Sequence, residues 1–371
     1  MTSDRAYWLA WSTLTGIGPI LLQRLQRHFG TLAAAWDAPA AALGEVDGFG
    51  RQTCDSILRE RSHLDPAELL ATHSDHNPNF WTPADPDYPR LLLEIPDPPP
   101  VLYYRGQVNP QENQGILPAI ALVGTRSPSD YGRRWTQRLT QALIDSGWTI
   151  VSGLADGIDT LAHKTCVEEG GRTVAVVGTG VDIVYPSSNR TLAQRILEQG
   201  LILSEYPAGT KPDRAHFPRR NRIIAGLSRA TLVLEAPSRS GALITARLAN
   251  DCGRDVYALP GSLDNERSLG CLELLNQGAQ VVLGEADLLE RLGSLPSFLT
   301  APVEQLSLLS PLPSLTPDLS KILNAMSLEA IALDGIVQTT GLATGLVLGS
   351  LTQLEMMGLV TQLPGSRYQR C

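Results

Sequence analysis

The sequence is short of aromatic side chains, of positive charge and of paired cysteines. Aromatic residues make up 5% of the 371 residues, so Leu, Ile, Val and Ala must fill most of any core. The formal net charge of −8 at pH 7 argues against a protein that coats nucleic acid through overall basicity. Any contact with a polyanion therefore needs a local basic patch.

The cysteines and the N-terminal residues exclude further classes of protein. The five thiols are scattered and odd in number, and no two of them form a C-x-x-C pair. This pattern is typical of reduced thiols in a cytosolic protein and offers no zinc site. The N-terminal residues lack a basic stretch followed by an apolar one, and no long apolar run occurs in the chain. We therefore expect a cytoplasmic protein without a membrane anchor or a metal.

Residues 1–68 are predicted to form a helical domain of the helix-hairpin-helix or SAM-like kind. Apolar residues recur at helical spacing in three segments, Tyr7–Leu14, Leu21–Phe29 and Cys54–Leu58. Two glycine hairpins, Thr15–Pro19 and Val46–Gly50, separate them. The proline-rich stretch Trp81–Pro100 then cannot be helical over most of its length and should run extended across a neighbouring surface.

Residues 69–295 are predicted to form a Rossmann-like α/β domain, because strand and helix patterns alternate along them. The expected strands are Ile120–Val123, Thr149–Val151, Val174–Val177, Leu201–Leu203, Thr231–Leu234, Val256–Leu259 and Gln280–Leu283. The expected helices include Arg133–Ser146, Gly157–Glu169, Leu192–Glu198 and Ala242–Cys252. Buried strands separated by helices indicate a mostly parallel sheet with helices on both faces.

The C-terminal part of the chain is predicted to form a linker and a winged-helix domain. Residues 296–318 are rich in proline and almost without charge, which is typical of a flexible linker. Residues 319–371 show three helical patterns and a terminal hairpin, the layout of a winged helix. The helical patterns are Ile322–Met326, Ala330–Val337 and Val347–Met357, and the hairpin strands are Leu359–Leu363 and Ser366–Gln369.

Glycine, serine and threonine loops follow several of the predicted strands, where ligands of open parallel sheets bind. These loops open directly into helices, so their backbone N–H groups and the positive helix end suit a phosphate. They contain Gly124, Thr125, Arg126 and Ser127 after the first strand, Gly153 after the second, and Ser240 and Gly241 after the fifth. A G-x-G-x-x-G fingerprint and a P-loop are both absent, so we expect neither a nicotinamide nor an ATP cofactor.

The segment Lys211–Arg222 carries five basic residues and one acidic residue, which leaves a net charge of −12 on the rest of the chain. A basic loop with one aromatic residue in its middle suits a single strand of nucleic acid, because cations neutralise phosphates and Phe217 offers a face for a base. The alternative is a solvated loop that pairs with nearby carboxylates. The predicted contacts are Lys211, Phe217, Arg219, Arg220, Asn221 and Arg222.

No catalytic constellation is predicted. We interpret His163 as a polar partner within its helix, and His216 as an extra contact or a residue that shapes the loop. Asp156 and Asp159 flank Gly157 at a helix start, where capping is the commoner role.

Together these motifs closely resemble the bacterial DNA-processing protein A family, also called DprA or Smf. The resemblance spans about 140 residues, and the three-part layout of the chain also matches. The matching segments are Val123–Arg126, Ser152–Asp159, Tyr185–Pro186, Ser204–Pro207, Phe217–Ile224, Ser240–Ala246 and Leu259–Gly261.

The resemblance implies a DNA-binding Rossmann-like domain and a role in natural transformation and DNA processing. Such a protein binds incoming single-stranded DNA, protects it and loads the RecA recombinase without being an enzyme, and it forms a homodimer through the Rossmann-like domain. The family's Gly-Ser/Thr-Arg loop corresponds to Gly124, Thr125 and Arg126, and its basic-aromatic loop to Lys211 and Phe217–Arg222.

An enzyme that acts on nucleoside monophosphates is the alternative. Nucleotide-processing Rossmann proteins similar to lysine decarboxylase carry P-G-G-x-G-T-x-x-E at a comparable loop, where the glutamate takes part in nucleoside cleavage. Alignment of that pattern on Gly241 puts Thr245 at the position of the acid, so the catalytic group is missing.

The two outer domains show no charge that favours DNA. Residues 1–64 contain six basic and six acidic side chains, so contact of the glycine hairpins with phosphates competes with a structural or protein-contact role. Residues 319–371 have a net charge of zero, and the expected recognition helix, Thr344–Met357, lacks Lys and Arg. Docking of a protein or self-association is therefore favoured there over reading of duplex DNA.

Overall fold

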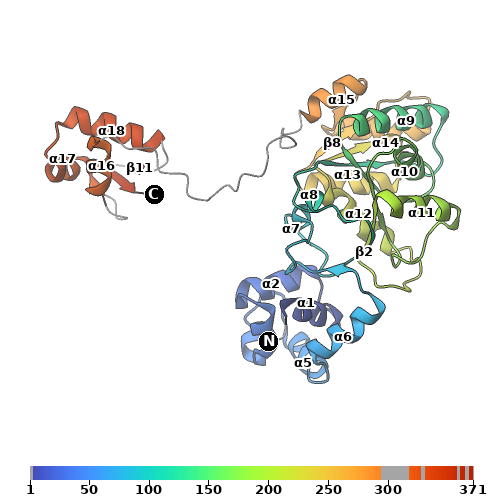
Figure 1. Cartoon of the computed structure of the whole chain (residues 1–371), viewed down its shortest axis with the longest axis horizontal. Coiled ribbons are helices and arrows are strands. Elements are labelled where there is room, and N and C mark those ends of the chain that lie inside the picture. The colour runs from blue at the N-terminus through green and yellow to red at the C-terminus, as the bar shows by residue number, and fades with distance from the viewer. Residues whose placement is uncertain (1–2, 294–316, 327–330, 357–359, 364–366, 371) are drawn as a thin grey trace. The chain divides into compact units, whose positions relative to one another are not determined.

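The computed structural model describes residues 3–293, 317–326, 331–356, 360–363 and 367–370. The chain divides into two compact units, residues 1–296 and residues 297–371 (Figure 1). The predicted linker, residues 296–318, lies almost entirely outside the described residues. The division of the chain into four segments at residues 68, 295 and 318 stays a prediction.

The first unit is built on a nine-stranded sheet in the order β1-β2-β6-β5-β4-β3-β7-β8-β9. Strands β3 to β9 run parallel, whereas β1 and β2 form an antiparallel edge beside β6. The strands are β1 (Phe80–Trp81), β2 (Leu102–Gly106), β3 (Ala119–Val123), β4 (Thr149–Ser152), β5 (Thr173–Val177), β6 (Leu201–Ser204), β7 (Ala230–Val233), β8 (Asp255–Ala258) and β9 (Gln280–Val281).

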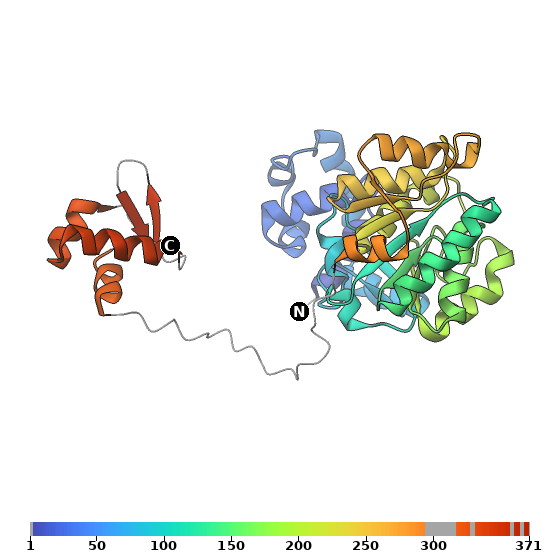
Figure 2. The same ribbon diagram turned by 90° about the horizontal axis from the view of Figure 1, so that it is seen from above.

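Helices cover both faces of this sheet (Figure 2). Ile120 and Leu122 of β3 pack on one face with α9 and α10, and Ala121 and Val123 pack on the other with α12 and α13. This alternation follows from the two-residue period of a strand. The helices of this part are α7 (Arg90–Leu93), α8 (Pro110–Asn113), α9 (Asp130–Asp145), α10 (Ile158–Glu168), α11 (Arg190–Gln199), α12 (His216–Leu227), α13 (Gly241–Asp251), α14 (Leu269–Asn276) and α15 (Glu285–Leu292), with two 3-10 turns at Ser187–Asn189 and Glu266–Ser268.

The N-terminal residues form a helical cluster against the antiparallel edge of the sheet. Leu9 packs with Phe80, Val101 and Tyr103, and the Arg5 guanidinium lies 3.8 Å from the centre of the Phe80 ring. This contact explains why the helices share one compact unit with the sheet. The helices are α1 (Asp4–Thr13), α2 (Pro19–Phe29), α3 (Leu32–Asp37), α4 (Ala40–Leu43), α5 (Arg51–Arg61) and α6 (Pro66–His76).

The second unit has the winged-helix layout expected from its sequence. Three helices pack on a three-stranded sheet in the order β10-β12-β11, and Ile322, Ile336, Val347 and Leu351 fill the core between them. The elements are α16 (Pro317–Asn324), β10 (Ile331–Ala332), α17 (Leu333–Thr340), α18 (Thr344–Met356), β11 (Val360–Leu363) and β12 (Arg367–Arg370).

The seven predicted strands all occur in the parallel part of the sheet, and the four predicted helices around them are present. Two expectations were wrong. The basic loop ends at Ala215, because α12 begins at His216 and takes up the second half of the segment. The proline-rich stretch is also not simply extended, since it contains α7 between β1 and β2. None of the helices in the described residues combines the length and apolar character that crossing a bilayer requires.

Candidate functional site

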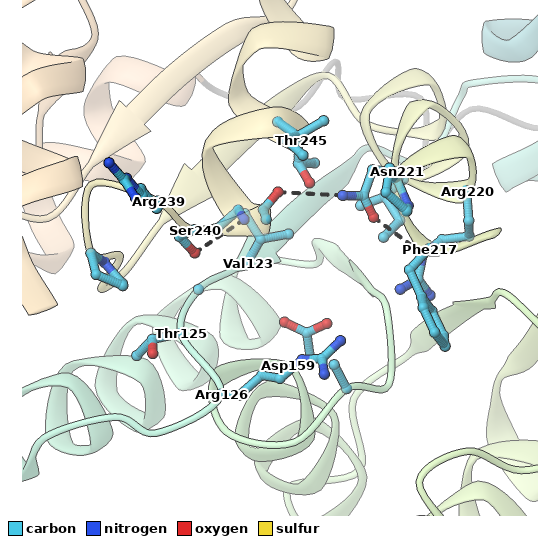
Figure 3. Close-up of a pocket in the computed structure, with 18 of the residues that line it drawn as sticks. Val123, Thr125, Arg126, Asp159, Phe217, Arg220, Asn221, Arg239, Ser240 and Thr245 are labelled. Atoms are coloured by element: carbon cyan, nitrogen blue, oxygen red, sulfur yellow. Dashed lines mark hydrogen bonds between the residues drawn. The ribbon is translucent and has the colours of Figure 1, made fainter. Parts of the chain in front are cut away.

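A cavity of about 670 Å³ opens at the carboxyl ends of β3 and β7 (Figure 3). The chain runs from β3 outward through β4, β5 and β6, and then crosses to β7 on the other side of β3. The connections therefore leave β3 and β7 in opposite directions, which opens a crevice between neighbouring strands. The order of the strands thus fixes the place of the cavity.

The loop after β3 is held close to the wall of the cavity by backbone contacts. The Thr125 N–H donates to the Glu235 carbonyl oxygen at 2.6 Å, and the Ile158 N–H donates to the Thr125 carbonyl oxygen at 3.1 Å. Gly157 has a φ of +86°, and a Cβ there would collide with the Thr125 carbonyl oxygen. Only glycine tolerates both the positive φ and the close approach of the Thr125 carbonyl oxygen. Gly157 therefore lets the loop after β4 touch the loop after β3. The Arg126 side chain is left exposed at the cavity rim.

A buried carboxylate fixes the far end of the same loop. Glu235 is 1% exposed, and its carboxylate accepts hydrogen bonds from the Ser129 N–H at 2.8 Å and the Ser129 hydroxyl at 2.6 Å. The Ser129 hydroxyl in turn accepts from the Gly132 N–H at 3.2 Å as the N-cap of α9. Glu235 therefore sets where α9 begins and keeps the loop after β3 rigid.

The loop after β7 supplies the second side of the cavity. The Ser240 hydroxyl accepts from the Ala242 N–H at 3.2 Å and caps α13, and a Cβ at Gly241 would meet no atom within 4 Å. The N-terminus of an eleven-residue helix therefore borders open space, where an anion is favoured. Arg239, one residue before the cap, is exposed at the rim.

The third side consists of aromatic rings and the first turn of α12. Phe217 stacks on Tyr185 with ring centres 5.6 Å apart, and the Arg126 guanidinium lies 5.9 Å from the centre of the Phe217 ring. A Cβ at Gly178 would come within 3.0 Å of the Phe217 ring, so glycine is needed behind it. Tyr185 is 43% exposed, which leaves an aromatic surface at the cavity rim.

Arg220 and Asp159 lie together in the cavity wall, both of them buried. Arg220 donates to the carbonyl oxygens of Gly153 and Val176, and Asp159 Oδ2 accepts from the Gly153 N–H at 3.1 Å. Burial raises the pKa of Asp159 to about 6, although the Arg220 charge acts to lower it. Burial likewise lowers the pKa of Arg220 to about 10. Asp159 therefore orders the loop after β4, instead of capping α10 as its sequence position suggested.

Arg222 faces away from the cavity, into the protein. Its side chain is 6% exposed, and its guanidinium donates to Asp97 at 2.8 Å and to Glu205. These ion pairs raise the pKa of Arg222 despite its burial. This corrects the prediction that Arg222 contacts a phosphate, because its donors are already occupied by protein carboxylates. For Arg222, the alternative interpretation of the basic segment, pairing with nearby carboxylates, is the correct one.

The cavity gathers residues from distant parts of the chain. Eight of the predicted contacts line it: Gly124, Thr125, Arg126, Phe217, Arg220, Asn221, Ser240 and Gly241. Five do not, namely Ser127, Gly153, Lys211, Arg219 and Arg222, although Gly153 lines a small adjoining hollow and Lys211 and Arg219 are exposed.

Tyr185, Arg214, Arg239 and Asp159 also line the cavity, although they were not among the predicted contacts. Arg239 lies in the loop after the predicted strand Thr231–Leu234. A positive charge in such a loop could have identified Arg239 as a ligand contact from the sequence. Tyr185 lies in the segment Tyr185–Pro186 that matches the family, but the sequence did not indicate that folding brings this ring onto Phe217.

The charges that line the cavity favour an anion. Four arginines and one aspartate line it among the described residues, and three of the arginines, Arg126, Arg214 and Arg239, are exposed. No group of His, Cys, Asp and Glu in the part of the chain that the structure describes is arranged to hold a metal ion. His163 is buried, bonds to the Thr173 hydroxyl at 2.7 Å and has its pKa lowered to about 3 by burial, so its polar partner lies on β5 and not within its own helix as predicted.

The architecture of this protein is a Rossmann-like sheet with an arginine-lined cavity at its switch point, joined in one chain to a winged helix. Residues 79–293 match the family model of DNA recombination-mediator protein A, and residues 309–366 match that of the DprA winged helix domain. The chain is 51% identical to Protein Smf of Synechocystis sp., and the match covers 99% of each chain. This protein belongs to the DprA/Smf family of DNA-processing proteins.

Two solved structures are similar to this chain. DNA processing protein A of Streptococcus pneumoniae is 35% identical with a TM-score of 0.67, and the match covers 78% of this chain and 97% of that one. DNA processing protein A of Helicobacter pylori, whose structure describes a single-stranded DNA binding mode of that protein, is 31% identical with a TM-score of 0.52. That match covers 57% of this chain and 95% of the other.

Proposed function

We propose that this protein binds single-stranded DNA in the cavity between β3 and β7 and performs no chemistry on it. The observation that carries this proposal is the meeting of exposed arginines with the aromatic pair of exposed Tyr185 and half-buried Phe217 around one cavity. Arginines neutralise successive phosphates, and aromatic faces stack on bases of any sequence. The single-stranded DNA binding described for the Helicobacter pylori relative supports the same ligand.

The aromatic pair favours a single strand over a duplex. Phe217 and Tyr185 offer ring faces, and a base reaches such a face only after it leaves its own stack. In duplex DNA that step requires unpairing as well as unstacking. We expect single-stranded DNA to bind more tightly than duplex DNA of the same length.

A fluorescence anisotropy titration tests this function. A labelled oligonucleotide in single-stranded and duplex form is titrated with wild-type protein and with Arg126→Ala and Arg239→Ala at several salt concentrations. Loss of a phosphate contact lowers the affinity and flattens the salt dependence by about one unit of slope. Arg90→Ala is the control, because Arg90 is exposed on α7 and does not line the cavity. Unchanged affinity and slope in both test variants would remove these loops from the binding site.

The absence of catalysis is supported by the chemistry of the cavity walls. The Ser240 hydroxyl is engaged as a helix cap, and Thr245, 2% exposed, stands where a related nucleotide-cleaving site carries its glutamate. Among the described residues, no histidine lines the cavity. Incubation with nucleoside monophosphates, followed by chromatography for free base, tests this part of the proposal. Steady release of base that scales with protein concentration would contradict it.

We further propose that the bound strand is protected and passed to the RecA recombinase. The match to the family model of a recombination mediator supports this role, since a mediator brings a recombinase to single-stranded DNA. Strand exchange by RecA on DNA covered with single-strand-binding protein should speed up when this protein is added. Arg126→Ala should lose the stimulation together with DNA binding, and nuclease digestion of the strand should slow only with the wild-type protein.

A homodimer through the Rossmann-like domain completes the proposal. Leu263 is 79% exposed and Leu283 is 69% exposed, and they follow the neighbouring strands β8 and β9 at one edge of the sheet. Two large exposed leucines at a sheet edge suit a self-complementary contact. Sedimentation of Leu283→Lys should show a shift toward monomer, whereas Leu93→Lys, at an exposed leucine on α7, should leave the dimer intact. A wild-type protein that sediments as a monomer would refute this contact.

The winged helix is proposed to contact protein and not duplex DNA. Its helix α18 carries no Lys or Arg and exposes Leu346 at 46% and Leu348 at 41%. Exposed apolar side chains on a helix suit a protein partner, whereas phosphate contacts need cations. Removal of residues 309–371 should leave the affinity for both single-stranded and duplex DNA unchanged. A fall in duplex affinity would assign DNA contact to this unit.

A further inference from the structure

The cavity that favours anions contains a carboxylate in its wall. Asp159 is 7% exposed and lines the cavity beside Arg126 and Arg220, as Figure 3 shows. A carboxylate in this position repels phosphate oxygens. A protein that bound nothing but phosphates here would bind them better with a neutral residue at position 159.

The contacts of Asp159 within the protein leave it able to accept further hydrogen bonds. Oδ2 accepts from the Gly153 N–H at 3.1 Å, and Ala155 and Ser152 also form hydrogen bonds that lower the pKa of the carboxyl, whereas a carboxylate offers about four acceptor positions on its two oxygens. Burial outweighs these hydrogen bonds and the Arg220 charge, and it raises the pKa of Asp159 to about 6.

Arg220 does not neutralise Asp159 through a direct ion pair. Its Nη1 donates to the carbonyl oxygens of Gly153 and Val176, and its Nε donates to Asn221 Oδ1 at 3.3 Å. A Cβ at Gly153 would lie 2.7 Å from Arg220 Nη2 and 2.8 Å from Asp159 Oδ2, so both groups pack against this glycine. The ligand atom that meets Asp159 must therefore be a donor.

In a DNA strand the strong donors are the N–H groups of the bases, because phosphates and deoxyribose within a strand only accept. Guanine alone carries two adjacent donors on its Watson–Crick edge, the N1–H and the 2-amino group, and these match the two oxygens of a carboxylate. The apolar side chains of Ile224 and Ile244, which also line the cavity, can pack on a base. The volume of about 670 Å³ falls within the range of roughly 300–1,000 Å³ found for sites that enclose small ligands.

We propose that the cavity binds one whole nucleotide of the strand and prefers guanine, whose Watson–Crick edge donates to Asp159 while its phosphate lies at the Arg126–Arg239 rim. Asp159 is then a specificity-determining residue within a site that otherwise binds without regard to sequence. This inference rests on the proposed binding of single-stranded DNA at the same cavity. It adds a preference for one base, which the phosphate contacts and the aromatic pair do not supply.

Competition between oligonucleotides tests the preference. The host is an oligo-dT strand, and one central thymidine is replaced by deoxyguanosine, deoxyinosine or deoxyadenosine. We expect the strand with deoxyguanosine to bind about tenfold more tightly than the one with deoxyinosine, because inosine lacks the 2-amino donor. This comparison uses wild-type protein throughout, so it does not depend on the folding of a variant. Equal affinities of the two strands would overturn the proposal.

A pair of variants then assigns the preference to Asp159. Asp159→Asn keeps the size of the side chain but replaces one acceptor with a donor, so the strands with deoxyguanosine and deoxyinosine should bind this variant with equal affinity. Asp156→Asn is the matched control, since Asp156 is exposed, bonds to Ser188 and lines only the small adjoining hollow. A preference that persists in Asp159→Asn, or disappears in Asp156→Asn, would overturn the assignment.

Oligo-dT separates failure of this inference from failure of the proposed function. If oligo-dT does not bind, the cavity is not a strand-binding site. If oligo-dT binds without a guanine preference, only the role of Asp159 is refuted. Competition by free dGMP, compared with free dIMP, tests whether the guanine is bound as part of a strand. A guanine preference among the free nucleotides that is absent among the strands would overturn this part of the proposal.

Discussion

The two halves of the basic segment Lys211–Arg222 have opposite environments although their composition is similar. Lys211 and Arg214 lie in an exposed loop, and Arg214 lines the cavity. Arg220 and Arg222 lie four and six residues inside α12 from its start at His216, and both are 5% exposed. A charge on the loop is available to a ligand, whereas a charge on the buried side of the helix is bonded to protein atoms. Residue type alone therefore does not separate binding from structure here.

The largest expected effect is a loss of stability on substitution of Arg222, on the buried side of α12. Arg222→Ala leaves Glu205 without its buried partner and removes the bond to Asp97, so the free energy of unfolding should fall by about 3 kcal/mol. Urea denaturation measures this loss. Arg219→Ala, at an exposed position on the same helix, should change the stability by less than about 0.5 kcal/mol. A stable Arg222→Ala protein that fails to bind DNA would instead place Arg222 in the interface.

The aromatic pair should give the next largest effect. Phe217→Ala removes the ring that stacks on Tyr185 and faces Arg126, and stacking on a base contributes roughly 1–3 kcal/mol. The affinity for oligo-dT should fall at least about fivefold, with the salt dependence unchanged, because no charge is lost. Anisotropy at several salt concentrations checks both quantities. Phe217→Tyr keeps the ring and should restore most of the affinity.

The exposed arginines at the rim should show a smaller loss of affinity with a different signature. Arg239→Ala should weaken oligo-dT binding several-fold and lower the salt slope by about one unit, because one phosphate contact is removed. Arg239 has no role in the core, since it is exposed in the loop before α13. Its unfolding curve should therefore overlay that of the wild type. A changed slope in Phe217→Ala but not in Arg239→Ala would reverse the roles given to the ring and the cation.

The smallest expected effect is on the pH dependence of binding. Burial raises the pKa of Asp159 to about 6, so the carboxylate takes up a proton and loses its charge as the pH falls from about 7 to about 5. Repulsion of the phosphates then decreases, and oligo-dT affinity should rise about threefold over this interval. Arg220 on α12 is the charge that acts on Asp159, and Arg126 on the loop after β3 lines the same cavity. The pKa of His163 on α10, about 3, keeps that ring neutral throughout the interval.

Asp159→Asn provides the reference for this pH effect. The variant keeps every other titrating group but has no carboxylate at the cavity wall. Its affinity for oligo-dT should therefore vary less with pH than that of the wild type. Equal pH profiles for the two proteins would show that another group controls the response.

The parallel part of the sheet was predictable because its signals are local. Each strand is a short apolar run, and α9 and α13, which follow two of these runs, begin at the side-chain caps Ser129 and Ser240. The antiparallel edge was missed, since β1 has two residues and gains its stability from contacts with α1 and not from its own pattern. Helix α12 was missed because Pro218 and the cluster of arginines suggested a loop, although proline is tolerated in the first turn of a helix.

The sequence by itself determined which loops meet at the site. A parallel sheet carries the loops that follow its strands on one edge, so Gly124, Thr125, Arg126, Ser240 and Gly241 were bound to lie on the same side. Only the tertiary structure decided which charged side chains face the cavity. The rotation of α12 turns Arg222 toward Glu205 and Asp97, and the folding of distant segments brings Tyr185 onto Phe217 and Asp159 beside Arg220. The direction of a side chain on a helix depends on what the helix packs against, and that partner lies far away in the sequence.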